Sequence, residues 1–141
     1  MLGILQVSAS GLSAERTRLQ TTSQNIANAR TTRTDEGGAY KRKIPVFQAT
    51  EIPGDPFQDL MDAKLETASV VDVIEDARAP EMVYDPGHPD ADPETGLVEM
   101  PNVNLIEEMV DMITASRSYE ANVTAMSATK AMALKALEIG R

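Results

Sequence analysis

His88 is the one histidine of the 141-residue chain, and it lies in a loop rich in aspartate and proline. An imidazole among carboxylates could bind a metal ion or activate a serine nucleophile. The nearby aspartates are Asp85, Asp90 and Asp92. A calcium loop of the EF-hand type starting at Asp90 would need glycine and glutamate where Thr95 and Pro101 stand. Zinc would need more histidine or cysteine ligands. We therefore interpret residues 85–93 as a proline-stiffened, solvated turn without a metal.

Other catalytic signatures are also missing from the sequence. It has no Gly-x-Ser-x-Gly nucleophile elbow and no glycine-rich phosphate-binding loop. The absence of cysteine excludes disulfides, thiolate metal sites and cysteine nucleophiles. An acidic surface explains the many carboxylates in the middle of the chain without glycosidase chemistry. We predict a protein that is not an enzyme and has no catalytic residue, no cofactor and no small-molecule substrate.

The net charge of −9 is unevenly distributed along the chain. Residues 1–50 carry seven basic and three acidic side chains (+4), residues 51–103 carry two and fourteen (−12), and residues 104–141 carry four and five (−1). An acidic chain repels phosphate backbones, so we expect no nucleic-acid partner. The basic run Lys41–Lys43 has two interpretations. It is either a solvated strand start or a charged patch that sets the register between identical subunits.

The first residues carry none of the ordinary targeting signals. Met1–Leu12 lacks a basic start, and Gln6, Ser8 and Ser10 interrupt its apolar residues. It therefore resembles neither a secretory signal peptide nor a membrane span. We expect a protein made in the cytoplasm without direct membrane insertion, unless another export route recognises its N-terminus.

The two ends of the chain are predicted to form helices. All eight prolines lie between Pro45 and Pro101, so the flanking segments can form continuous helices. Residues 1–30 are predicted to form the first helix, with a heptad line of Leu5, Leu12, Leu19 and Ile26. An apolar stripe this narrow stabilises an isolated helix only weakly, so we expect the helix to pack against a partner.

Residues 104–141 are predicted to form the second helix. Asn104 is a candidate N-cap and Glu107 a candidate for the reciprocal hydrogen bond of a capping box, while Gly140 is a plausible stop. Its main stripe runs in steps of three and four through Leu105, Met109, Met112, Ser116, Tyr119, Val123, Met126, Lys130, Ala133 and Leu137. Ile106, Val110 and Ile113 widen the apolar surface at its start.

The middle segment, residues 31–103, has the signals of short strands. We predict strands at residues 40–49, 69–74, 82–84 and 97–100, and a loop over residues 50–67. The expected fold class is α+β. The two terminal helices pair in a coiled-coil-like hairpin, and a small β-rich, proline-rich segment joins them.

Two stretches of the sequence resemble the bacterial flagellar basal-body rod and hook proteins. Residues 8–16 (SASGLSAER), followed by Asn25-Ile-Ala-Asn-Ala29, are similar to the N-terminal signature of that family. Residues 116–123 (SRSYEANV) are similar to its C-terminal motif. The run 84–92 (YDPGHPDAD) together with residues 101–104 (PNVN) most resembles the proximal-rod type. The residues after Asn28 lack the Thr-Pro-Gly-Phe type of turn found in the longer relatives.

The resemblance implies a structural subunit of the flagellar rod, the drive shaft that crosses the periplasm and encloses the export channel. Implied partners are other rod proteins, copies of the same chain, the flagellar type III export apparatus and basal-body ring components. Export would proceed without a cleaved signal peptide. The candidate assembly interface consists of Leu5, Leu12, Leu19, Asn25, Ile26, Asn28, Leu105, Met109, Met112, Ser116, Tyr119, Asn122, Val123, Met126 and Leu137. We expect the amides of Asn25 and Asn28 to satisfy free backbone groups at a helix end or to bridge to a neighbour.

Two alternatives belong to other functional classes. One is a cytoplasmic adaptor or secretion chaperone built on a coiled-coil hairpin, which would be folded and of defined stoichiometry when purified. The other is an enzyme or a metal-binding protein that uses the His88 loop. A rod subunit would instead have weakly ordered ends and would polymerise.

Overall fold

The structure is a computed structural model that describes residues 2–51 and 66–139. Most of the predicted loop 50–67 and the predicted stop at Gly140 therefore lie outside the described residues. In chain order the elements are helix α1 (Leu2–Ala27), strands β1 (Lys43–Glu51), β2 (Glu66–Glu75), β3 (Glu81–Tyr84) and β4 (Leu97–Met100), and helix α3 (Leu105–Ile139). The predicted α+β class is confirmed, with a helix at each end of the chain and strands between them.

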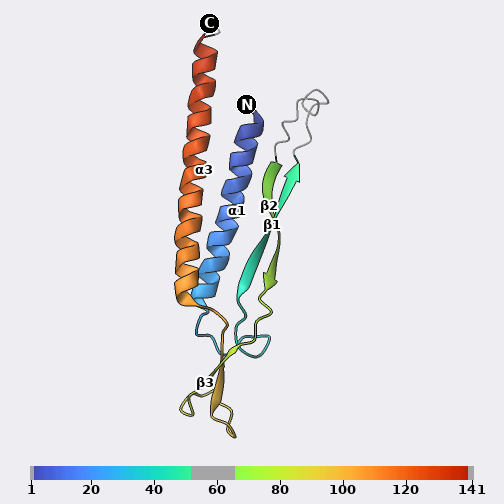
Figure 1. The fold of residues 1–141 in the computed structure, drawn as a ribbon, viewed down its shortest axis with the longest axis vertical. Coiled ribbons are helices and arrows are strands. Elements are labelled where there is room, and N and C mark those ends of the chain that lie inside the picture. Colours follow the sequence, from blue (N-terminus) through green and yellow to red (C-terminus); the bar gives the residue numbers. More distant parts are fainter. Residues whose placement is uncertain (1, 52–65, 140–141) are drawn as a thin grey trace.

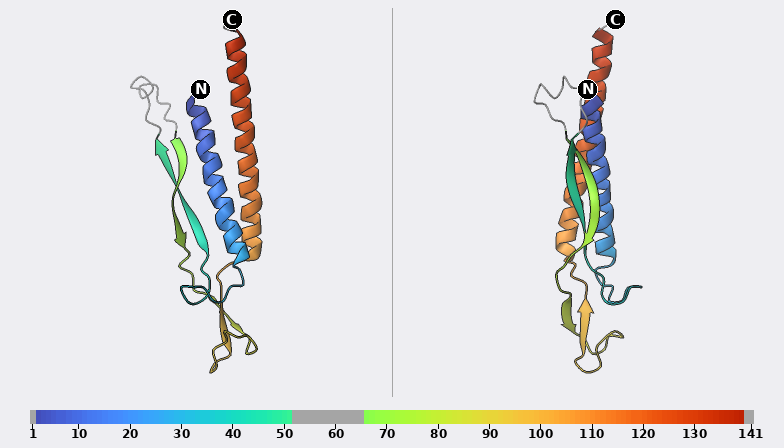
Figure 2. Two further views of the ribbon diagram at one scale, coloured as in Figure 1. Left: turned by 180° about the vertical axis from the view of Figure 1, so that it is seen from behind. Right: turned by 90° about the vertical axis from the view of Figure 1, so that its right-hand side faces the viewer.

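The elements form one elongated layer with a small hairpin at its base. Figure 1 shows α1 between α3 and the β1–β2 hairpin, with the two helices running antiparallel and both chain ends at the same end of the molecule. Figure 2 shows the same layer from behind and from its edge. The β3–β4 hairpin lies at the opposite end, below the start of α3. α3 has 35 residues and α1 has 26, so the last turns of α3 extend beyond α1.

Local hydrogen bonds explain where the helices begin and end. At the start of α3, the Asn104 side-chain oxygen accepts from the Ile106 N–H at 3.0 Å, which is the predicted N-cap. Glu107 makes no return hydrogen bond to Asn104 among the residues that the structure describes, so the cap is single rather than reciprocal. At the end of α1, the Gln24 carbonyl accepts both the Asn28 backbone N–H at 3.0 Å and the Asn28 side-chain amide at 2.9 Å, which holds the last turn closed.

Each hairpin is a separate two-stranded antiparallel sheet. In the first sheet Lys43 pairs with Glu75, and an irregularity between Val46 and Phe47 shifts the register. In the second sheet Tyr84 pairs with Leu97. Gly96 precedes that strand with φ +66°, and a Cβ there would lie 2.9 Å from the Tyr84 ring. Only glycine fits both the backbone angle and the ring.

The buried side chains of α1 and α3 are mostly small or polar. They include Ser8, Ala14, Thr22 and Asn25 from α1 and Glu108, Ala115 and Thr129 from α3. Gly11 permits a close approach, since a Cβ on it would lie 3.0 Å from the Asn122 side chain. The heptad residues Leu5, Leu12, Leu19 and Ile26 are only half-buried. The fully buried positions of the two helices are therefore mostly small or polar, and the line of leucines is only partly covered.

Candidate assembly interface

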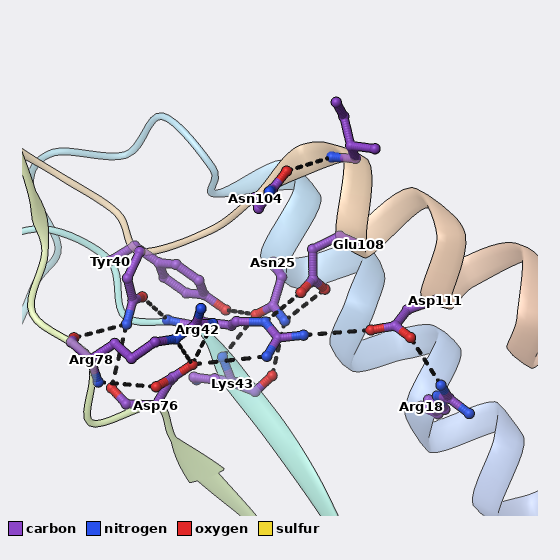
Figure 3. Close-up of polar contacts among 12 residues, drawn as sticks. Arg18, Asn25, Tyr40, Arg42, Lys43, Asp76, Arg78, Asn104, Glu108 and Asp111 are labelled. Atoms are coloured by element: carbon purple, nitrogen blue, oxygen red, sulfur yellow. Dashed lines mark hydrogen bonds and ion pairs between the residues drawn. The ribbon is translucent and has the colours of Figure 1, made fainter.

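A buried amide joins three segments at the base of the helix pair. Asn25, in the last turns of α1, is 1% exposed. Its side-chain oxygen accepts from the Lys43 N–H and the Tyr40 hydroxyl, both at 2.9 Å. Its side-chain nitrogen donates to the Lys43 carbonyl at 2.9 Å and to Glu108 Oε2 at 3.0 Å. All four of its hydrogen-bonding positions are thus used, and α1 is tied to the start of β1 and to α3 (Figure 3).

Arg42 brings the charges of this region together. Its Nε donates to Oε1 of Glu108, a carboxylate that is also 1% exposed. Its other nitrogens lie 3.5 Å from Asp111 Oδ2 and 3.8 Å from Asp76 Oδ2. Arg18 of α1 pairs with the same Asp111 at 3.0 Å. A guanidinium suits this position because its planar fork can donate to several carboxylates at once.

Residues after β2 and after β4 also bond to Arg42 or to its partners. Arg42 donates its backbone N–H to Asn102 at 2.8 Å, and the Asn102 amide donates to the Arg78 carbonyl at 3.0 Å. Arg78 also pairs with Asp76 at 2.7 Å. Hydrogen bonds from Arg78 hold the pKa of the Asp76 carboxyl below its usual value. Burial, and then the nearby carboxylates Glu108 and Glu75, raise the pKa of Tyr40.

We call this cluster the basal network. It consists of Arg18, Asn25, Tyr40, Arg42, Asp76, Arg78, Glu108 and Asp111 (Figure 3). Its three arginines balance its three carboxylates. Of the two interpretations of Lys41–Lys43, the solvated strand start does not describe Arg42, whose side chain is 18% exposed and paired within the chain. Sequence reasoning missed this role because Glu108, its main partner, lies 66 residues away.

The predicted interface residues of α1 lie beside the helix contact. Ser10 faces β2, accepting from the Ala68 N–H at 3.2 Å, and Gly11 faces Asn122 of α3. Successive helix residues are about 100° apart, so Leu12 points away from the hairpin. The same step leads from Arg18 to Leu19 and from Asn25 to Ile26. Each of these heptad residues therefore follows a residue that contacts α3, and its side chain points about 100° away from that contact.

The predicted stripe of α3 shows the same displacement. Glu108, Asp111 and Asn122 contact α1 or lie against it, and the next residues are Met109, Met112 and Val123. Because the helices are antiparallel, a step toward the C-terminus leads to the same side of the pair on both. We call the resulting surface the apolar face. It consists of Leu12, Leu19 and Ile26 of α1 and Met109, Met112 and Val123 of α3.

The structure places the predicted interface residues in three groups. Asn25 is buried. The half-buried residues are Leu5, Leu12, Leu19, Ile26, Asn28, Met112, Asn122 and Met126. The exposed residues are Leu105, Met109, Ser116, Tyr119, Val123 and Leu137. Asn25 therefore acts within the chain. The other residues leave apolar atoms open to solvent along both helices.

The His88 loop is held by its own turns. His88 Nδ1 accepts from the Asp90 N–H at 3.1 Å, and the His88 N–H donates to the Asp85 carbonyl at 3.1 Å. Within residues 2–51 and 66–139, no group of three or more His, Cys, Asp or Glu side chains is placed to hold a metal ion. None of the helices in the described part of the chain is long and apolar enough to cross a membrane.

Both ends of the chain match known family models. Residues 5–33 match the model described as flagella basal body rod protein. Residues 94–139 match the model described as flagellar basal body rod FlgEFG protein C-terminal. These ranges contain most of α1 and α3.

Full-length relatives give a closer match. A protein of Bacillus subtilis (strain 168) is 42% identical, over 97% of this chain and 96% of the relative. One of Borreliella burgdorferi is 42% identical over 96% and 94%, and one of Escherichia coli O157:H7 is 39% identical over 100% and 98%. All three are named flagellar basal-body rod protein FlgC. The chain therefore belongs to the FlgC family of flagellar basal-body rod proteins, whose members are structural subunits and not enzymes.

Proposed function

We propose that this chain polymerises in the proximal rod of the flagellar basal body, through surfaces on its two terminal helices. The rod would cross the periplasm, carry torque and enclose the export channel. Partners would be copies of the chain, other rod proteins and basal-body ring components. The export apparatus would pass the chain from the cytoplasm in an unfolded state, without removing a signal peptide.

The observation that carries this proposal is the large apolar surface left open on α3. Ile106 is 74% exposed, and Met109, Val110 and Ile113 are each exposed by more than half. The apolar face continues this surface onto α1. A soluble monomer rarely leaves so many large apolar side chains uncovered on one element, so the surface is suited to contact other subunits.

Two further features support assembly after export. The buried line between α1 and α3 contains few large apolar side chains, so the helix pair gains little burial by itself. The chain also contains no cysteine, which removes any risk of wrong disulfides outside the cytoplasm. A chain that remains weakly folded until it meets its neighbours is compatible with export in an unfolded state.

The test is to locate the chain in the assembled organelle. Basal bodies would be purified from cells in which this chain is the only copy of its kind, and imaged by cryo-electron microscopy. We expect α1 and α3 in the wall around the export channel, with the apolar face covered by a neighbouring subunit. Helices at the outer surface of the rod, or an apolar face open to solvent there, would contradict the proposal.

A further inference from the structure

Away from the basal network, few contacts between α1 and α3 fix the axial position of one helix relative to the other. Its buried side chains are small, so they do not interlock as large knobs in holes would. The Thr129 hydroxyl bonds within its own helix, donating to the Ala125 carbonyl at 2.9 Å. A shift of α3 by one turn would move Asn122 away from Gly11, but would otherwise replace one set of small contacts with another.

The base of the pair is different, because its contacts tolerate no such shift. Asn25 reaches Glu108 at 3.0 Å and Arg18 reaches Asp111 at 3.0 Å. One helical turn is about 5.4 Å, so a slide of that size would break both contacts. It would also leave Glu108, 1% exposed, without the Arg42 guanidinium. A buried charge without its partner is strongly disfavoured.

The same contacts place the β1–β2 hairpin. Arg42 immediately precedes β1, and Asp76 immediately follows β2. Arg42 lies 3.8 Å from Asp76 and also accepts a hydrogen bond from the Asp76 N–H at its carbonyl, at 2.7 Å. The base of the hairpin is thereby connected to the carboxylate of Glu108 on α3.

We infer that Arg42 and Glu108 are positioning residues that fix the axial register of α3 on α1. Buried polar groups are known to select one register among several that apolar packing would accept. The apolar face takes residues from both helices, so it is continuous only in the register that the basal network selects. The consequence for assembly rests on the proposed function, whereas the register itself does not.

The absence of cysteine allows a direct measurement of register. A Cβ on Gly11 would lie 3.3 Å from Asn122 Cγ, close enough for a disulfide between Gly11→Cys and Asn122→Cys. Gly11→Cys with Ser118→Cys, or with Met126→Cys, reports a shift of one turn in either direction; both pairs also carry Asn122→Ala, because the Asn122 side chain would crowd the new Cβ. Each pair would be placed in the full-length chain, and its thiol–disulfide equilibrium measured in glutathione buffer.

The decisive comparison places the same cysteine pairs in the double variant Arg42→Met/Glu108→Met. It removes the buried ion pair without leaving a buried charge, so the fold can persist. We expect the native chain to favour the 11–122 disulfide over both shifted pairs, and the double variant, which keeps the Arg18–Asp111 pair, to show a much weaker preference. Arg42→Lys, which keeps the charge, and Lys41→Met, which removes an exposed one, should both retain it. A native-like preference in the double variant, or none in the native chain, would overturn the inference.

Incorporation into basal bodies separates this inference from the proposed function. The double variant without cysteines would be tested in cells for rod assembly. Loss of register together with failed assembly supports both steps. Loss of register with normal rods would overturn the claimed link to the apolar face. A native chain that favours the 11–122 disulfide and is not found in the rod would overturn the proposed function and leave the register inference standing.

Discussion

Asn25 and Glu108 meet through a 3.0 Å hydrogen bond although 83 residues separate them, and each side chain is 1% exposed. The bond joins the end of α1 to the start of α3. Because both groups are buried, changes to either one, or to Arg42, test how far the fold depends on polar contacts rather than apolar packing.

Removing the Arg42 guanidinium should destabilise the fold strongly. Arg42→Met leaves Glu108 as a buried carboxylate without its cation, and breaking a buried pair in this way costs about 3–5 kcal/mol. We expect the urea midpoint of the full-length chain, followed by circular dichroism, to fall sharply. Lys41→Met is the control, because the Lys41–Glu75 pair is largely exposed and should contribute less than about 1 kcal/mol. Equal effects of the two substitutions would show that the basal network does not stabilise the chain.

Replacing Asn25 with aspartate tests the amide itself. Asn25→Asp loses the donor to Glu108 and places two carboxylates next to each other, so we expect a loss of about 3 kcal/mol or more. Asn28→Asp removes one exposed hydrogen bond to the Gln24 carbonyl and should cost about 0.5–1.5 kcal/mol. The helix content of each variant at increasing temperature gives the measurement. If Asn28→Asp proved the more damaging change, the assigned role of Asn25 would be wrong.

The Asp76 carboxyl makes part of the stability dependent on pH. Its pKa is lower in the folded chain than the ordinary value of 3.8, because Arg78 bonds to the charged form. The unfolded chain therefore binds the proton more readily, so this contribution is present above about pH 4 and is lost as the pH falls through the folded pKa. We expect Asp76→Asn to flatten the acid limb of a plot of urea midpoint against pH. An unchanged acid limb would contradict the Asp76–Arg78 assignment.

A charge on the apolar face should block assembly. Leu19→Asp removes about 1.5–3 kcal/mol of apolar burial in the assembled state and adds the larger cost of burying an unpaired carboxylate. Every subunit repeats the defect, so we expect cells that make and export the protein but do not swim and lack complete rods. Gln20→Asp, at an exposed position, should leave swimming intact. Normal swimming with Leu19→Asp would exclude this face as the assembly surface, and loss of export would point to recognition of the segment by the secretion gate.

Assembly should also change the order of the helices. In dilute free chain we expect the amides of residues 1–28 and 105–141 to exchange with solvent much faster than in purified rods. The reason is that the described parts of α1 and α3 have no large apolar side chain that is fully buried, and the apolar face is uncovered. Hydrogen exchange followed by mass spectrometry provides the comparison. Equal protection in the two states would mean that the helix pair is already stable by itself.

Local patterns predicted the elements more accurately than their contacts. The strand at residues 97–100 has the predicted bounds, and α3 begins directly after the predicted cap. The first strand was expected from Tyr40 but begins at Lys43, because Tyr40 and Arg42 turn into the basal network instead. Turn and capping signals depend on a few neighbouring residues, so they can be recognised in a single sequence.

The side of each helix that is buried was predicted less well. Large apolar residues dominate a heptad pattern, so the sequence favoured Leu12 and Leu19 as a contact with the second helix or with a neighbouring subunit, without deciding between the two. The observed contact uses Gly11 and small neighbours, which permit a closer approach than leucine does. The partner of Arg42 could not be predicted either, because no local spacing relates it to a glutamate 66 residues away.

The connections at the base of the molecule also determine the order in which it can fold. Asn25–Glu108 spans 83 residues and Arg18–Asp111 spans 93. Contacts between such distant positions carry a large loop-closure entropy and form late. If the chain is exported as proposed and leaves the channel N-terminus first, it cannot close this base until residue 108 has left the channel. The basal network would then form only after about three quarters of the polypeptide has been released, so a chain delivered to a lesser extent lacks the conformation of a finished one.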